Sequence, residues 1–258
     1  IELFERRVWE KYGESSRAVT HYTPHMLQLL EFQEKMERTV PIIVGAASPT
    51  NHAETVVGVE RFVKWLVTEP EDKIRRYLEL VLEERLGALE FYREYAYENG
   101  ARFFCIWGGA RTWGPNHLDK FGYVDRIFAE EVGKIFPYAF WHQCGKNLPY
   151  AMEQLADWKG IKAVQYDEPY YFQDIPWHDW CEWVAKLFSG KKCAMNAPTT
   201  QRACFGTPDE IKQMVHEFIE ATLPYTTAVV MPGCEIDSYA PVENVRAIIE
   251  ATRSTQVK

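Results

Sequence analysis

The sequence predicts an α/β protein, a (β/α)8 TIM barrel, from two observations. Short apolar, β-branched or aromatic runs alternate with longer amphipathic stretches, the order expected of parallel strands joined by crossover helices. Polar and metal-binding side chains follow several of these runs, as they do at the catalytic face of such barrels. The length of 258 residues and the 47% hydrophobic content suffice for one large core. We therefore expect a single barrel domain over residues 1–258.

Six runs in the sequence are predicted to be strands. They are Pro41–Ala47, Ala101–Trp107, Tyr138–Cys144, Lys162–Asp167, Lys192–Ala197 and Thr227–Gly233. A closed barrel of this type needs eight strands. The first forty residues look mainly helical, Arg17–Thr23 is at best a poor strand, and the chain begins with Ile1 rather than Met. We expect the first two βα units to be absent from this chain.

Two of the intervening stretches carry clear helix signals. Between Asp72 and Tyr97, apolar residues recur at the spacing of one helical face. Further along the chain, Thr207 is a predicted N-cap, Pro208 occupies the first turn and Glu210 completes a capping box. These patterns predict one long helix after Pro70 and a helix that begins at Pro208.

Composition and charge exclude several classes of partner. The net charge of −8 is spread along the chain without a stripe of Lys and Arg, which disfavours nucleic acid. No apolar run approaches the roughly 18 to 20 residues that cross a bilayer, and the amino end lacks a secretion signal. A cytoplasmic enzyme with no membrane contact is the expectation, and its six cysteines are then reduced and available as metal ligands.

A histidine and two cysteines at strand ends form the predicted metal site. His142 and Cys144 are two positions apart, so on a strand both point to the same side. Cys234 follows the last strand and can reach the barrel axis from the opposite wall. Two thiolates and one imidazole suit tetrahedral zinc and leave a fourth position open. The alternative is that these are ordinary buried residues, since cysteine is among the most often buried types. The remaining cysteines are not expected to be ligands: Cys105, Cys181, Cys193 and Cys204.

Other residues at the strand ends complete the candidate site. Asp167 and Glu168 are candidate catalytic groups that orient a ligand or protonate a leaving oxygen, with solvated loop carboxylates as the alternative. Five residues are candidates for substrate binding: Trp107, Trp113, Asn196, Tyr170 and Tyr171. The aromatic members of this set suit the wall of an apolar pocket for an aromatic ether, or else they anchor loops.

Several motifs together resemble the uroporphyrinogen-decarboxylase-like superfamily. The segments are Pro41–Pro49, Asn99–Ala101, His142–Gly145, Phe205–Ile211 (FGTPDEI), Met231–Ile236 (MPGCEI) and Pro241–Val245. They span nearly the whole chain from Pro41 onward, and GTPDEI followed by PGCEI is a specific combination. The resemblance is to the zinc-dependent corrinoid methyltransferase branch, whose His-x-Cys motif and distant second Cys fall on His142, Cys144 and Cys234. The decarboxylase branch lacks this pair of cysteines.

This resemblance implies a zinc-dependent methyltransferase that uses a corrinoid. The methyl group would pass between a small donor, with a methoxylated aromatic favoured, and the cobalt of the corrinoid, which is an O-demethylase step. The sequence has no Asp-x-His-x-x-Gly run, so we expect the corrinoid to arrive on a separate carrier protein. The alternatives are a methylcobamide:thiol methyltransferase, a metal-free lyase resembling uroporphyrinogen decarboxylase, and a non-catalytic partner subunit with an incomplete barrel.

Overall fold

A computed structural model describes most of the chain. It covers residues 28–29, 31–39, 41–98, 100–108, 113–143, 145, 148–169 and 174–255. The poor strand considered at Arg17–Thr23 lies outside these residues. The chain divides into two compact units. The first comprises Ile1–Phe140 with Lys159–Ile161, and the second comprises Trp141–Trp158 with Lys162–Lys258. Each unit is described on its own below.

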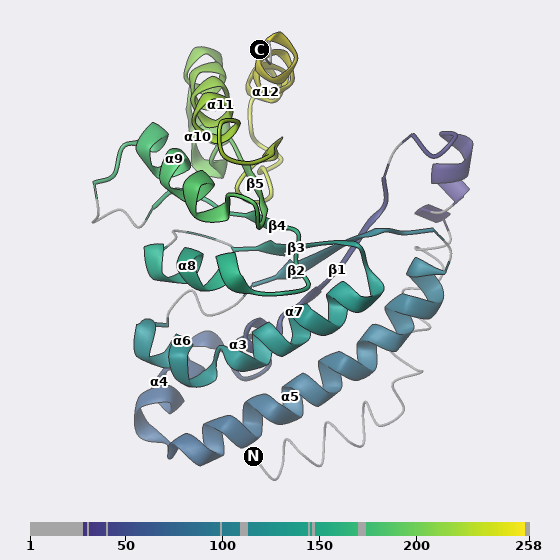
Figure 1. Cartoon of the computed structure of the whole chain (residues 1–258), viewed down its shortest axis with the longest axis vertical. Coiled ribbons are helices and arrows are strands. Elements are labelled where there is room, and N and C mark those ends of the chain that lie inside the picture. Colours follow the sequence, from purple (N-terminus) through teal and green to yellow (C-terminus); the bar gives the residue numbers. More distant parts are fainter. Residues whose placement is uncertain are drawn as a thin grey trace. The chain divides into compact units, whose positions relative to one another are not determined.

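The strands form a six-stranded sheet whose spatial order follows the sequence, β1-β2-β3-β4-β5-β6 (Figure 1). Their bounds are β1 Ile43–Ala47, β2 Phe103–Trp107, β3 Tyr138–His142, β4 Ala163–Gln165, β5 Cys193–Asn196 and β6 Ala228–Val230. The pairs β1–β2, β4–β5 and β5–β6 are parallel. Each strand lies inside one of the six predicted ranges, and helices connect successive strands. The predicted α/β class is therefore confirmed, with six strands in the described part of the chain.

In the first unit, helices between β1 and β3 surround a core rich in aromatic rings. The helices are α3 Pro49–Val57, α4 Val59–Thr68, α5 Glu71–Tyr92, α6 Pro115–Phe121 and α7 Tyr123–Ile135. The α5 helix buries Ile74, Leu78 and Val81, which lie on the face predicted from their spacing. A π-helical turn, η1 Arg93–Tyr97, follows directly. The predicted helix over Asp72–Tyr97 is thus correct in extent, with a change of hydrogen-bond pattern in its last five residues.

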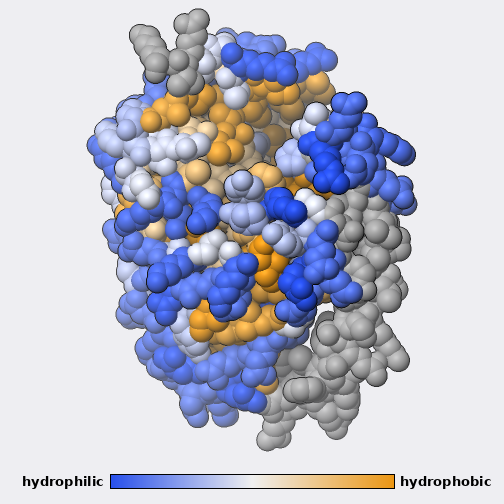
Figure 2. Space-filling view, turned by 45° about the vertical axis from the view of Figure 1, so that its right-hand side comes forward, coloured by the Kyte–Doolittle hydropathy of each residue, from blue (hydrophilic) through white to orange (hydrophobic). Residues whose placement is uncertain are grey.

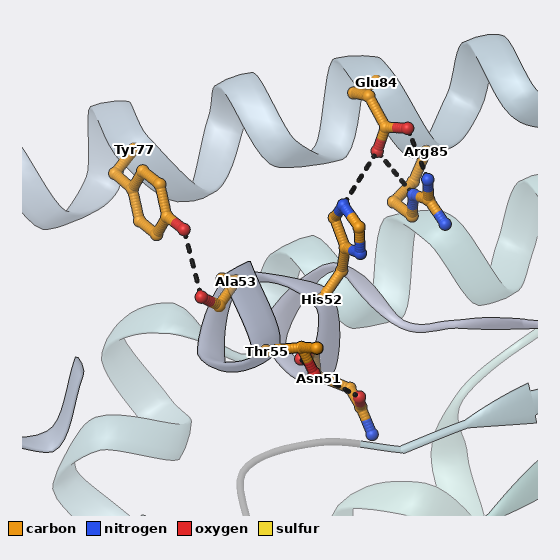
Figure 3. A network of polar contacts seen from close by, with 7 residues as sticks. All are labelled: Asn51, His52, Ala53, Thr55, Tyr77, Glu84 and Arg85. Carbon is orange, nitrogen blue, oxygen red and sulfur yellow. Dashed lines mark hydrogen bonds and ion pairs between the residues drawn. The ribbon is translucent and has the colours of Figure 1, made fainter. Parts of the chain in front are cut away.

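Polar contacts join α3 to α5 in the first unit (Figure 3). The Tyr77 hydroxyl on α5 donates a hydrogen bond to the Ala53 carbonyl on α3 at 3.0 Å. Nearby, His52 Nε2 lies 3.6 Å from a Glu84 carboxylate oxygen, and Arg85 donates two hydrogen bonds to that same carboxylate. These contacts fix the helix that follows β1 against the long outer helix.

In the second unit, helices again alternate with strands. They are α8 Pro149–Asp157, α9 Trp177–Phe188, α10 Thr200–Phe205, α11 Pro208–Thr222 and α12 Val242–Ser254. The start of α11 confirms the predicted capping box, because the Thr207 side chain accepts from Glu210 N while the Glu210 carboxylate accepts from Thr207 N. The α9 helix buries Trp180 and Cys181 against the strands of this unit.

One face of the molecule is predominantly polar. Figure 2 shows one face on which hydrophilic residues cover most of the area and hydrophobic patches lie between them. Among the described helices, none has both the length and the apolar character needed to cross a membrane.

Candidate functional site

The candidate site is built at the carboxyl ends of strands in the second unit. There β3 ends at His142, and the next residue, Gln143, donates its N–H to the carbonyl of Gln165 on β4 at 2.8 Å. This pairing brings the side chains of His142 and Gln165 together, with His142 Nδ1 2.8 Å from Gln165 Oε1. Both side chains are buried. The ring of His142 is therefore held by a neighbouring strand rather than by its own loop.

The partners of Gln165 fix which nitrogen of His142 carries the proton. The Gln165 amide nitrogen donates to the carbonyl of Pro232, so the amide oxygen is the end that faces His142. An amide oxygen only accepts hydrogen bonds, and His142 Nδ1 must therefore be the donor. A neutral imidazole with hydrogen on Nδ1 has its lone pair on Nε2, the form in which histidine binds a metal.

Cys234 faces that lone pair. Its Sγ lies 3.5 Å from His142 Nε2. Ideal zinc distances of about 2.3 Å to sulfur and about 2.05 Å to nitrogen, at a tetrahedral angle, place two such ligands about 3.6 Å apart. The observed separation matches two ligands of one zinc ion. Cys144, the third predicted ligand, lies outside the described residues, and within those residues no three His, Cys, Asp or Glu side chains converge on one point.

Three hydrogen bonds, to the end of β5, to the segment that follows β5 and from the Gln165 side chain on β4, hold the loop that carries Cys234. The Met231 N–H donates to the Asn196 carbonyl at 3.0 Å, and the Gly233 N–H donates to the Pro198 carbonyl at 3.1 Å. The third is the bond from Gln165 to Pro232. Since backbone groups on both sides of the loop are paired, the position of the Cys234 thiol is set by the sheet.

Gly233 allows this loop to lie against Asp167. A Cβ atom at Gly233 would sit 2.8 Å from Asp167 Cγ and 3.0 Å from Asp167 Oδ1, which is shorter than such contacts allow. The loop can lie this close to Asp167 because Gly233 has no side chain. The approach brings the carboxyl group of Asp167 beside the residue that precedes Cys234.

The predicted catalytic residues, Asp167 and Glu168, differ in their surroundings. Asp167 is buried, and its Oδ1 accepts from the Glu168 N–H at 2.8 Å while its carbonyl accepts from Trp180 Nε1 at 2.9 Å. Glu168 is half-buried. The buried side chain of Asp167 therefore lies beside Gly233, in the loop that carries Cys234.

Asn196 is the last residue of β5 and contacts the backbone of the segment that leads to Cys234. It is fully buried, its Oδ1 accepts from the Ala197 N–H at 2.7 Å, and its carbonyl holds Met231. The sequence analysis proposed Asn196 for substrate binding. In the structure its side chain stabilises the end of β5 and offers no exposed surface.

The predicted aromatic pocket residues have three different outcomes. Trp107, at the end of β2, is 46% exposed and available to a ligand. Trp113 is 1% exposed, stacks on Phe62 and donates from Nε1 to Glu54 at 2.9 Å, so it is a core residue of the first unit. Tyr170 and Tyr171 lie outside the described residues.

Each of the four other cysteines lies on a different strand or helix. Cys105 is inside β2, Cys181 is on α9, Cys193 begins β5 and Cys204 is on α10. Burial raises the pKa of the Cys181 thiol well above its usual range, which keeps it protonated and unsuited to a metal. That none of the four binds metal remains a prediction.

Sequence reasoning missed Gln165 and Gly233. The signal for Gln165 was present: a polar residue inside an otherwise apolar run, two positions before Asp167 and hence on the same face of the strand. Gly233 precedes a candidate ligand, where a glycine often marks close approach of the backbone. Neither signal identifies the contacting residue, because Gln165 contacts His142 and Gly233 lies against Asp167, both from distant parts of the sequence.

A second buried carboxyl lies in the first unit. Asp125 on α7 accepts hydrogen bonds from the Thr50 N–H at 2.9 Å and from the Thr50 hydroxyl at 2.5 Å, at the start of α3. Burial raises the pKa of Asp125 to about 7, although the bonds from Thr50 act in the opposite direction. Since both contacts go to a helix start, Asp125 is a structural cap for α3.

Comparisons with known proteins agree on the family and the fold. The model of the uroporphyrinogen decarboxylase (URO-D) family matches residues 8–255. Among solved structures, a methyltransferase from Methanosarcina mazei superimposes with a TM-score of 0.69 at 21% sequence identity, covering 89% of this chain and 64% of that one. This chain therefore spans less than two thirds of that methyltransferase. A search of curated proteins finds no match. At this identity the structural likeness shows a shared fold.

Proposed function

Because the chain belongs to the uroporphyrinogen decarboxylase family, we propose that it is a zinc-dependent methyltransferase of that family. The methyl group moves between a methoxylated aromatic donor and the cobalt of a corrinoid carried by a separate protein. The observation that carries this proposal is the pair formed by His142 Nε2 and Cys234 Sγ, 3.5 Å apart. A decarboxylase without a metal has no need for a thiol facing the unprotonated nitrogen of a buried histidine.

The ligand set suits zinc. His142 and Cys234 supply one nitrogen and one sulfur at the separation of two ligands of one ion, and Cys144 is proposed as the third ligand. Three protein ligands leave one position for the substrate, the arrangement of catalytic rather than structural zinc sites. When bound there, zinc supplies Lewis acidity to an ether oxygen, or lowers the pKa of a bound thiol.

The chain's own residues have separate roles in demethylation. In demethylation the bond between the methyl carbon and the ether oxygen would break, the methyl group would go to Co(I) of the corrinoid on the carrier protein, and the oxygen would leave as a phenolate that needs a proton. Asp167, whose carboxyl group lies against Gly233 beside Cys234, is the proposed proton donor. Glu168, which is only half-buried, is proposed to orient the substrate. The corrinoid carrier is the proposed partner, and the cytoplasm is the proposed location.

Metal analysis and a methyl-transfer assay on the same sample test the proposal. We expect about one zinc per chain, and methylation of cob(I)alamin by a methoxylated aromatic compound. Methylation of a thiol by methylcobalamin, with no activity on ethers, would reassign the substrate within the methyltransferase class. Metal-free protein that decarboxylates a porphyrinogen would replace the proposal by the lyase, and zinc-free protein inactive in all three assays would favour a non-catalytic partner subunit.

A further inference from the structure

We propose that Gln165 is a positioning residue that ties the imidazole of His142 to the Cys234 loop through the two ends of one amide. The inference rests on the proposed zinc site, since it concerns two of the three proposed ligands. Gln165 is itself buried and does not need to touch substrate or metal to have this effect. It orients the ring of His142 and positions the loop that carries Cys234.

The oxygen end of the amide sets the histidine. Gln165 Oε1 lies 2.8 Å from His142 Nδ1, which requires the ring proton on Nδ1 and directs Nε2 toward Cys234 Sγ. Residues that receive a hydrogen bond from the second nitrogen of a metal-binding histidine fix its tautomer and its ring orientation. Without this acceptor the ring can rotate and place its proton on Nε2, where no metal can bind.

The nitrogen end of the same amide sets the cysteine loop. Gln165 Nε2 donates to the carbonyl of Pro232, two residues before Cys234. The sheet order places β4 and β5 between β3, which ends at His142, and β6, which precedes Cys234. The amide on β4 therefore bridges ligands from two strands that are not neighbours in the sheet.

Only a carboxamide of this length satisfies both partners. The histidine needs an acceptor and the Pro232 carbonyl needs a donor, and a glutamate supplies acceptors alone when it is ionised. Glutamate at this position would keep the bond to His142 but turn a carboxylate oxygen toward a carbonyl oxygen. Leucine has a similar volume and satisfies neither partner. The two substitutions thus separate the histidine contact from the loop contact.

The experiment uses the whole chain with Gln165→Leu and Gln165→Glu. Gln213→Leu is the matched control, since Gln213 is an exposed glutamine on α11 whose amide bonds only to Glu217. Zinc affinity is measured by competition with a chelator, and thermal unfolding is followed on the same samples. Nitrogen-15 NMR of metal-free protein reports the tautomer of His142.

We expect Gln165→Leu to weaken zinc binding by about 10- to 100-fold, the usual effect of removing a partner of a metal-binding histidine. In metal-free protein the same change should remove the preference for hydrogen on Nδ1. Gln165→Glu should keep the Nδ1 tautomer and still weaken zinc binding, because only the loop contact is lost. Gln213→Leu should change neither quantity. If Gln165→Leu does not fold, Gln165→Glu alone tests the loop contact.

Two results would overturn the inference. One is wild-type zinc affinity in both Gln165 variants. The other is an unchanged His142 tautomer in Gln165→Leu together with a lowered melting temperature, which would show a merely structural role. Failure of the wild-type chain to bind zinc at all would instead reject the proposed function, and the tautomer measurement in metal-free protein would still decide the role of Gln165.

Discussion

Two histidines in the described part of the chain, His52 and His142, differ in the charge of their partners. In the first unit, His52 faces the carboxylate of Glu84, which Arg85 already binds through two hydrogen bonds (Figure 3). In the second unit, His142 contacts a neutral amide through one nitrogen and a thiol through the other. One cluster is an ion pair with a histidine at its edge, and the other brings an imidazole and a thiol together.

This difference favours His142 over His52 as the proposed zinc ligand. Burial, followed by the nearby guanidinium of Arg85, lowers the pKa of His52, so this ring is neutral at pH 7 and its contact with Glu84 contributes little. A metal at His52 would have to compete with Arg85 for Glu84. At His142 the bond between Nδ1 and Gln165 keeps the ring in place and directs Nε2 toward Cys234. The contact made by the second ring nitrogen therefore indicates a possible metal-binding histidine better than the position of the histidine in the sequence does.

The largest expected effect on zinc binding comes from replacing the thiol of Cys234, which has no counterpart among the contacts that the described residues make with His52. Cys234→Ser should weaken zinc binding by at least about 100-fold, because loss of a ligand costs more than loss of an outer partner, which costs about 10- to 100-fold. Methyl transfer should fall with it. Zinc content after dialysis checks this, with Cys204→Ser on α10 as the control that keeps its zinc. Zinc retained by the Cys234 variant would mean that this cysteine is structural.

The next effect concerns pH and the first unit. The pKa of Asp125 is raised to about 7 from 3.8. The folded protein therefore holds this proton where the unfolded chain has lost it, and the resulting stability is complete below about pH 4 and is lost as the pH rises through about 7. Asp125→Asn should remove this decline, which amounts to a few kcal/mol in the free energy of unfolding. Urea unfolding at pH 5 and pH 8 measures it, and an unchanged difference between the two would contradict the assignment.

A smaller effect is expected where Asp167 meets Gly233. Gly233→Ala adds a Cβ atom 2.8 Å from Asp167 Cγ, so the loop must shift, at a cost of about 1–3 kcal/mol in the free energy of unfolding. Zinc binding should weaken, since the shifted residue precedes Cys234. Gly87→Ala on α5 is the control, because a Cβ there has no atom within 4 Å and should add about 0.5–1 kcal/mol of stability. Unchanged zinc affinity in the Gly233 variant would separate Asp167 from the metal site.

The smallest expected effect is at the other histidine. His52→Gln should change the free energy of unfolding by no more than about 1 kcal/mol, since the neutral ring makes no full ion pair with Glu84. Zinc content and methyl transfer should equal those of the wild type, whereas His142→Gln should lose both. Loss of zinc from the His52 variant would remove the distinction between the two clusters.

Local patterns in the sequence were enough to place the described strands and to single out two residues, His142 and Cys234, that the structure brings together. Apolar runs located all six strands, because parallel strands are buried on both faces. Helical spacing and a capping box located α5 and α11. His142 and Cys234 were identified because catalytic residues collect at strand ends, and the distance between them agrees with a shared ion.

Long-range contacts explain what the sequence did not reveal. The contacts of Gln165 depend on the register of β4 relative to β3 and on the distance from its side chain to Pro232. Neither can be read from the residues next to Gln165 in the sequence. Trp113 was expected at a pocket, but its indole N–H finds Glu54 on another helix and the ring is buried. Asn196 stands at a strand end as predicted, and its amide bonds to its own backbone instead of facing solvent. Side-chain type and position along a strand do not determine which way a group faces.

The most direct test of the zinc site is X-ray absorption at the zinc edge on the wild-type chain loaded with one equivalent of metal. We expect two sulfur ligands at about 2.3 Å and one imidazole nitrogen at about 2.0–2.1 Å, with a fourth light atom from solvent. Cys234→Ser should lower the sulfur count to one. A shell of oxygen and nitrogen alone, or one unchanged by Cys234→Ser, would contradict the assignment of His142 and Cys234 as ligands of one ion.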